Sequence, residues 1–142
     1  MLVGNLALAL AATFAGAAFY VSFAEHPARL LLDDKNQLTQ WKASYDAGGT
    51  MQASLAAASG SLGLIAAWMT VDWRWALGAI LILANWPYTL WSIMPTNREL
   101  KLIADNDAGP HSRALLKQWG RLHAVRTALG IAAAAIFLWA LQ

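Results

Sequence analysis

The chain has 142 residues, of which 58% are hydrophobic and 13% charged, whereas soluble domains average about 25% charged residues. This length allows a single domain, and such an apolar chain favours a membrane protein over a soluble helical bundle, whose helices would each keep a polar stripe. The chain has no cysteine, which excludes thiol–disulfide chemistry and thiolate metal sites. Its formal net charge is only +2, so the placement of the charges is more informative than their sum.

Four stretches without any charged side chain predict an all-α integral membrane four-helix bundle. About 20 apolar residues are needed to cross the ~30 Å core of a bilayer as a helix. We place the spans at about 2–24, 50–71, 75–94 and 119–141, within one membrane domain, 1–142. The first is expected to be a retained span and not a signal peptide. It starts without a basic residue, and Glu25-His26-Pro27 follows it in place of a small-residue cleavage site.

The first connection, loop 1, covers about residues 27–50. Pro27 is expected to end or bend the first span. Leu38, Trp41 and Tyr45 are spaced at i, i+3 and i+7, which predicts a short amphipathic helix on the membrane surface. Gly48-Gly49 is expected to end this helix.

In the second half of the chain, prolines mark the expected irregularities. Pro87 predicts a kink in the third span, because a proline removes one helical hydrogen bond. Thr96 with Glu99 three residues later is a capping-box pattern, which predicts a short helix in loop 3. Pro110 suits the first turn of the last helix, which we expect over about 111–141.

Nine of the ten basic residues lie in or beside loops 1 and 3, and only Arg74 lies in loop 2. Positively charged loops stay in the cytoplasm, so we expect both termini outside a bacterial inner membrane and loops 1 and 3 inside. The basic residues therefore indicate topology and no nucleic-acid partner. Small residues along the first two spans allow a homo-oligomer without requiring one.

Three clusters of polar side chains lie inside the predicted spans, where polar residues usually face the bundle interior. They are Tyr20, Ser22, Glu25 and His26; Asn85, Tyr88, Thr89, Ser92 and Thr96; and Trp119, His123, Arg126, Thr127 and Gly130. Structural interpretations stay open: a helix end reaching water, hydrogen bonds between helices, and an arginine that extends to the interface. The functional interpretation is one inward-facing pocket, lined by Glu25, His26, Tyr88, Thr96, Asn97, Trp119, His123 and Arg126.

Four sequence blocks carry a resemblance to a known family: 23–30, 85–89, 95–97 and 119–126. In their order and spacing, the chain resembles the DUF1772, or anthrone-oxygenase-like, family of small four-span membrane proteins. The fungal members implicated as anthrone oxygenases insert oxygen into a tricyclic anthrone to give an anthraquinone. The resemblance implies an oxygenase, with candidate positions Glu25, His26, Asn85, Asn97, Trp119, His123 and Arg126.

The leading hypothesis is an oxygenase or oxidase acting on a hydrophobic, anthrone- or quinol-like aromatic molecule. Such a substrate can lose a proton to give a carbanion that reacts with O₂ without a cofactor. His123, with an unperturbed pKa near ~6.5, is the expected base, and Arg126 would hold the developing oxyanion. Glu25 would orient His123 or His26. The expected ligand-binding residues are Tyr88, Asn85, Thr96, Asn97 and Trp119.

Two alternatives remain. Glu25, His26 and His123 could form a two-histidine, one-carboxylate iron site, or the two histidines could ligate haem. Neither cofactor is favoured, because adjacent residues such as Glu25 and His26 point about 100° apart on a helix. The alternative function is a non-catalytic membrane protein that binds or passes a small hydrophobic ligand, or packs against a partner.

Overall fold

The computed structural model describes all 142 residues, and the chain is helical throughout, with no strand. The elements are α1 (Leu2–Tyr20), the π-helical turn η1 (Val21–Glu25), α2 (His26–Arg29), α3 (Asp34–Thr70), α4 (Trp73–Leu83), α5 (Asn85–Tyr88), the π-helical turn η2 (Thr89–Ile93), α6 (Met94–Leu102), the 3₁₀ turn η3 (Asp105–Asp107) and α7 (Pro110–Ala140). Four continuous helical rods result, each long and apolar enough to cross a membrane. The predicted four-helix architecture is confirmed, and the chain is an integral multi-pass membrane protein.

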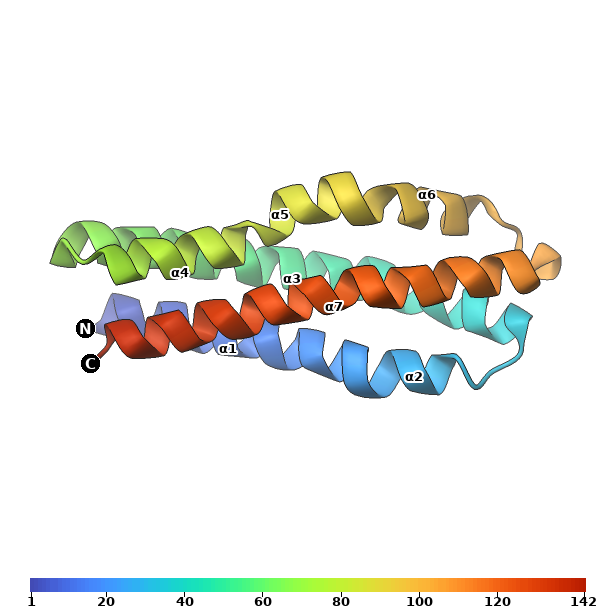
Figure 1. Ribbon diagram of the computed structural model, residues 1–142, viewed down its shortest axis with the longest axis horizontal. Helices are drawn as coiled ribbons and strands as arrows, with labels where there is room; N and C mark the ends of the chain where they lie inside the picture. Colours follow the sequence, from blue (N-terminus) through green and yellow to red (C-terminus); the bar gives the residue numbers. More distant parts are fainter.

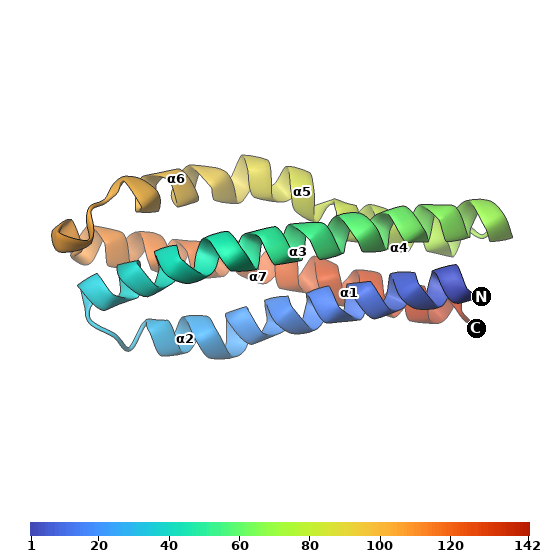
Figure 2. The ribbon, with the colours of Figure 1, turned by 180° about the vertical axis from the view of Figure 1, so that it is seen from behind.

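The four rods run alternately in opposite directions, so both termini lie at the same end of the bundle (Figure 1). Helix α1 packs against α3 and α7, and α4 packs against the same two helices. Figure 2 shows α1 and α3 side by side from behind. This arrangement packs α1 and η1 of the first rod against α7, which positions the functional site described below.

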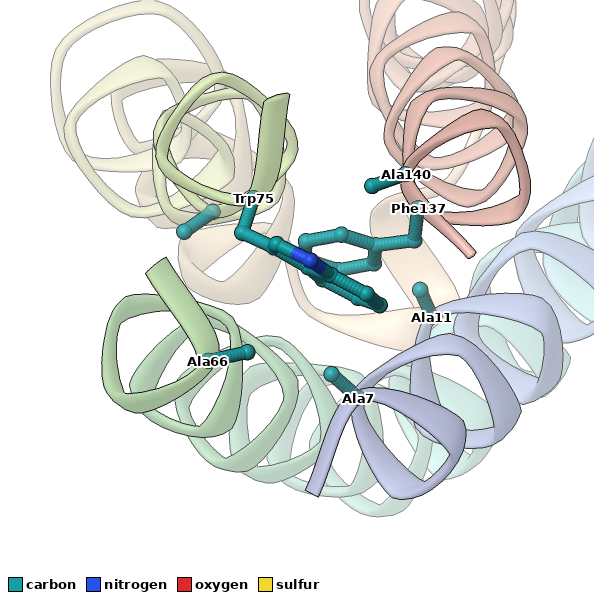
Figure 3. Close-up of a cluster of buried hydrophobic side chains, with 7 residues drawn as sticks. Ala7, Ala11, Ala66, Trp75, Phe137 and Ala140 are labelled. Atoms are coloured by element: carbon teal, nitrogen blue, oxygen red, sulfur yellow. The ribbon is translucent and has the colours of Figure 1, made fainter. Parts of the chain in front are cut away.

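Small residues let the helices approach closely at the end that holds the termini. The rings of Trp75 and Phe137 lie 5.5 Å apart, between small side chains such as Ala7 and Ala66 (Figure 3). A Cβ atom added at Gly78 would lie 2.5 Å from the Phe137 ring. The aromatic rings therefore occupy space that small residues leave open, as close packing within a membrane requires.

Prolines explain each irregularity of the rods. A proline ring clashes with the carbonyl four residues earlier in a regular helix. For Pro87 that residue is Leu83, where α4 ends, and α5–η2–α6 then runs away from the line of α4 (Figure 1). Pro27 and Pro95 each follow a π-helical turn by two residues. In these two places the widened turn accommodates the proline and the rod continues.

Two predicted details are wrong. The short surface helix of loop 1 does not exist, because α3 runs without a break from Asp34 to Thr70 through Gly48-Gly49. Its apolar face is not on a membrane surface: Leu38 and Trp41 are fully buried in the bundle. Burial of each of these two side chains stabilises the folded protein by about 1.5–3 kcal/mol. This gain exceeds the cost of keeping the two glycines in a helix, which is about 1 kcal/mol for each.

The short helix of loop 3 is also not separate, because α6 directly continues η2. Thr96 does not cap it; the side chain is buried in the first turn of α6. The chain between the last two rods is therefore only a short loop around η3. The prediction for the last helix is confirmed, with Pro110 in its first turn.

Candidate functional site

The face of α7 predicted from the sequence points into the bundle. Trp119, His123 and Arg126 are all buried, and the rings of Trp119 and His123 stack at 4.9 Å. On the facing rod, the π-helical turn η1 places the Ser22 hydroxyl 3.1 Å from Nδ1 of His123. The site therefore lies between the first and last rods, in the half of the bundle opposite to the termini.

Two arginines are buried in this half, and the first is saturated with partners. The Nη2 group of Arg29 donates to a Glu25 carboxylate oxygen at 2.7 Å and to the Ser44 hydroxyl at 3.2 Å. Its Nη1 group donates to Nδ1 of His26 at 2.9 Å, and its Nε group donates to the side-chain oxygen of Gln40. The Glu25 carboxylate is thus bound to Arg29 and forms no hydrogen bond with His123 or His26, either of which it was predicted to orient.

The second arginine, Arg126, has no such partners. It is 7% exposed, and its guanidinium forms no ion pair or hydrogen bond within the chain. The only specific contact is with the ring of Phe14, 5.7 Å from the guanidinium carbon. An unpaired buried charge costs several kcal/mol. The position therefore calls for a negatively charged or strongly polar partner from outside the chain.

Arg126 faces a cavity of about 370 Å³ that lies between α3 and α5–η2. Two more polar atoms on its wall are buried without a partner, namely Oδ1 of Asn85 and the hydroxyl of Thr89. The side-chain nitrogen of Asn85 donates to the Ile82 carbonyl at 3.0 Å, so the side-chain oxygen of Asn85 is the atom without a partner. Along the mouth lie Trp86 and Leu90, 45% and 55% exposed. The exposed ion pair of Lys101 with Asp46 lines the same cavity, so its wall has an apolar part and a charged part.

A second cavity of about 60 Å³ lies on the other side of Arg126. Its wall includes His123 and Trp119, and it shares Arg126, Tyr45 and Gly49 with the larger cavity. Three more polar atoms on the wall are buried without partners: the indole nitrogens of Trp41 and Trp119 and the side-chain oxygen of Gln52. A water occupies ~30 Å³ and needs two to four polar partners, so this cavity suits about two waters.

One comparison with known proteins identifies a family for the chain. Residues 41–136 match the family model of the anthrone oxygenases, and this segment includes the parts of α3, α5, η2 and α7 that line the larger cavity. The chain belongs to the anthrone oxygenase family. Membership confirms the resemblance seen in the sequence and indicates a membrane oxygenase-like function. No curated protein and no solved structure matches the chain.

In this anthrone oxygenase family member, the predicted residues do not line one inward-facing pocket. Glu25, Trp119 and His123 face the small cavity, Asn85 faces the large one, and Arg126 faces both. The other predicted residues, His26, Tyr88, Thr96 and Asn97, line neither cavity. The larger cavity opens sideways between α3 and α5–η2, because the break before Pro87 separates these rods.

Several predicted ligand contacts instead hold helices together. The Tyr88 hydroxyl donates to the Leu122 carbonyl at 2.9 Å, and the Asn97 amide donates to the Tyr45 hydroxyl at 2.7 Å. These bonds join α5 to α7 and α6 to α3. Interhelical hydrogen bonding was the structural interpretation left open for such residues.

The candidate metal ligands Glu25, His26 and His123 do not form a group that could hold a metal ion. Glu25 and Nδ1 of His26 both bind Arg29, and His26 faces neither cavity. The three-ligand iron arrangement considered for these residues is therefore not assembled. Haem ligation by the two histidines remains a prediction.

Sequence reasoning overlooked Gln52 and undervalued Arg29. Gln52 is the only Gln, Asn or charged residue between Ala47 and Val71, so the rule for polar residues inside spans would have found it. Arg29 was counted only as a positive loop charge. Its burial follows from the continuation of the first rod beyond Pro27, which the charge pattern does not reveal.

Proposed function

We propose that the protein is an oxygenase embedded in the membrane that acts on a hydrophobic, anthrone- or quinol-like aromatic molecule bound in the larger cavity. The observation that carries this proposal is Arg126, a buried guanidinium without a partner that opens onto a cavity lined by the exposed apolar side chains of Trp86 and Leu90. A flat aromatic substrate dissolved in the bilayer would reach the cavity from the side. Its oxygen would receive hydrogen bonds from Arg126 that strengthen as negative charge develops.

The cavity sizes support this assignment of roles. The larger cavity, about 370 Å³, falls within the ~300–1,000 Å³ typical of small-molecule sites. At about 60 Å³, the smaller one is too small for a fused aromatic ring system. The free oxygen of Asn85 would accept a hydrogen bond from a hydroxyl group on the substrate. We therefore place the substrate in the larger cavity, and His123 acts as the base from the wall of the smaller cavity.

The proposed reaction begins with the loss of a proton from an acidic C–H group of the substrate. The proton passes through a water in the small cavity to Nε2 of His123, while the electron pair remains as an enolate held by Arg126. The enolate carbon then forms a bond with O₂, and His123 returns the proton to the resulting peroxide. Removal of the second C–H proton expels hydroxide, which takes up that proton to form water. Overall, a CH₂ group and O₂ give a carbonyl group and water, and no further cofactor is needed.

One observation favours the alternative, a protein that binds or passes a hydrophobic ligand without changing it. His123 does not line the larger cavity, so a ligand can occupy that cavity without touching the base. Both functions predict that Arg126→Gln abolishes ligand binding. They differ at His123, which only the oxygenase requires.

The test uses purified protein in lipid nanodiscs with an anthrone, measuring ligand binding, O₂ uptake and carbonyl product together. General base catalysis typically contributes ~10²–10⁴-fold, so His123→Gln should lower turnover by about that factor while ligand binding persists. His111→Gln is the matched control, because His111 is exposed and pairs only with Glu99. Binding without O₂ uptake in the wild-type protein would instead establish the alternative.

A further inference from the structure

A chain of polar contacts runs from His123 to the backbone of the first rod. Nδ1 of His123 lies 3.1 Å from the Ser22 hydroxyl, which lies 2.8 Å from the Thr127 hydroxyl. The Thr127 hydroxyl in turn donates to the Ala18 carbonyl at 3.1 Å. His123 and Thr127 are buried and Ser22 is half-buried, and the Ser22 hydroxyl bonds only these two side chains.

Counting the protons gives this chain a direction. Two hydroxyl protons and one ring proton serve the three contacts, and a carbonyl oxygen only accepts. All three contacts are therefore hydrogen bonds only if the Thr127 proton goes to the Ala18 carbonyl at 3.1 Å and not to the Ser22 oxygen at 2.8 Å. The Thr127 oxygen must then accept from Ser22, which uses the single hydroxyl proton of Ser22. The Ser22 oxygen is left as an acceptor for Nδ1 of His123. Nδ1 therefore carries the ring proton, and Nε2 carries a lone pair.

The other buried histidine has the opposite arrangement. Nδ1 of His26 faces the guanidinium of Arg29 at 2.9 Å, and a guanidinium only donates. The proton of the His26 ring is therefore on Nε2. The two buried histidines differ in tautomer because their Nδ1 atoms have different partners.

We propose that Ser22 and Thr127 are positioning residues, which hold His123 in the Nδ1–H tautomer and leave Nε2 free to accept the substrate proton. The catalytic part of this inference rests on the proposed function, but the tautomer itself does not. When the substrate C–H bond breaks, its electron pair stays on the substrate and the proton binds Nε2, while the Nδ1–H bond to Ser22 is unchanged. Ser22 lies in η1, the π-helical turn that accommodates Pro27, and this turn sets its position.

Nitrogen NMR of ¹⁵N-histidine-labelled protein in nanodiscs tests the tautomers without requiring turnover. In the wild-type protein at neutral pH, His123 should be protonated at Nδ1 and His26 at Nε2; His123→Gln and His111→Gln assign the signals. Thr127→Val keeps the shape of Thr127 but frees the Ser22 proton to bond Nδ1, so His123 should switch to Nε2–H. Thr127→Ser keeps the hydroxyl and should keep the wild-type tautomer.

Two controls separate positioning from general damage. The His26 signals should be the same in every variant, and Thr13→Val should change neither histidine, because Thr13 is exposed and bonds only the Ala9 carbonyl. If His123 is protonated at Nε2 in the wild-type protein, or keeps Nδ1–H in Thr127→Val, the inference is wrong. If Thr127→Val does not fold, Ser22→Ala supplies the second test, since its loss of the Ser22 acceptor should remove the preference for Nδ1–H.

Turnover distinguishes the two proposals. If the reaction is observed, Thr127→Val should lower kcat at least tenfold and leave ligand binding unchanged, and Thr127→Ser should restore kcat. If the tautomers are as expected but no variant, including the wild type, consumes O₂, the positioning chain is correct and the oxygenase proposal fails.

Discussion

At the scale of single residues, the site depends on the contrast between two buried arginines. Every nitrogen of Arg29 has a partner, and its charge is balanced by Glu25. Arg126 has none and is kept buried at a cost in stability. Proteins commonly accept such a cost at binding sites, because the ligand supplies the missing interaction. The contrast separates an arginine that joins helices from one that is available for a ligand.

We predict that Arg126→Met makes the ligand-free protein more stable and unable to bind an anionic aromatic ligand. Replacing a buried ion pair by apolar side chains of similar size often stabilises a protein by about 1–4 kcal/mol, and Arg126 lacks even the attraction of a partner. Thermal unfolding in detergent and a ligand-binding titration measure the two effects. Arg121→Met, on the exposed side of the same helix, should change neither. A large loss of stability in Arg126→Met would mean that the guanidinium has a structural role.

A second residue-scale prediction concerns the loop outside the spans. Hydrogen bonds from Lys42 and Thr39, together with the nearby Lys42 charge, lower the pKa of Asp105 below its ordinary value of 3.8. A lowered pKa stabilises the folded protein above that value, and the benefit disappears as the pH falls through the folded-state pKa.

Asp105→Asn should therefore be less stable than the wild type near neutral pH, and the difference should vanish at a pH below the folded-state pKa. The effect is small because Asp105 is exposed to solvent. Melting temperatures of both proteins across this range measure it. Asp107→Asn is the control, since Asp107 lies in the same turn and forms no side-chain bond. A difference that persists in acid would rule out the carboxylate as its cause.

At the scale of helices, small residues and prolines set the geometry. Gly78 admits the Phe137 ring between α4 and α7, and Gly120 admits the His26 ring between α2 and α7. The prolines have two different effects: Pro87 follows a break, whereas Pro27 and Pro95 follow π-helical turns. The break opens the larger cavity, and the turn before Pro27 aims Ser22 at His123.

We predict that Gly78→Ala destabilises the bundle by about 1–3 kcal/mol, as overpacking of a filled core usually does. The added Cβ would lie 2.5 Å from the Phe137 ring, which has no room to move. Thermal unfolding in detergent measures the effect. Gly16→Ala is the matched control, because a Cβ at Gly16 meets nothing within 4 Å. Equal melting temperatures for the two variants would contradict the packing described here.

At the scale of the whole molecule, the bundle has two unlike ends. The end with the termini is closed by alanines and large rings, and the polar site lies in the other half (Figures 1 and 3). Nine of the ten basic residues also lie in that other half. If these charges keep it toward the cytoplasm, the proposed site lies in the inner leaflet. A homo-oligomer, which the small residues of the first two spans allow without requiring it, remains untested by this single chain.

We predict that loop 3 is cytoplasmic and loop 2 external. The chain has no cysteine, so single cysteines at Asn106 and Thr70 can be labelled without background. A membrane-impermeant maleimide should label Thr70→Cys in intact cells and Asn106→Cys only after the membrane is opened. The opposite pattern would show that the distribution of positive charge does not set the orientation of this protein.

The sequence determined the four spans, because a bilayer leaves the backbone no partner but its own helix and apolar runs of that length have no other stable form. It also placed His123 and Arg126 on one face of the last helix, since that follows from 3.6 residues per turn. It did not determine which polar groups meet. Glu25 binds Arg29 and leaves Arg126 free because prolines shift the rotation and spacing of the rods, and these depend on contacts between helices. The sideways opening of the cavity has the same origin, in a break whose direction only tertiary packing decides.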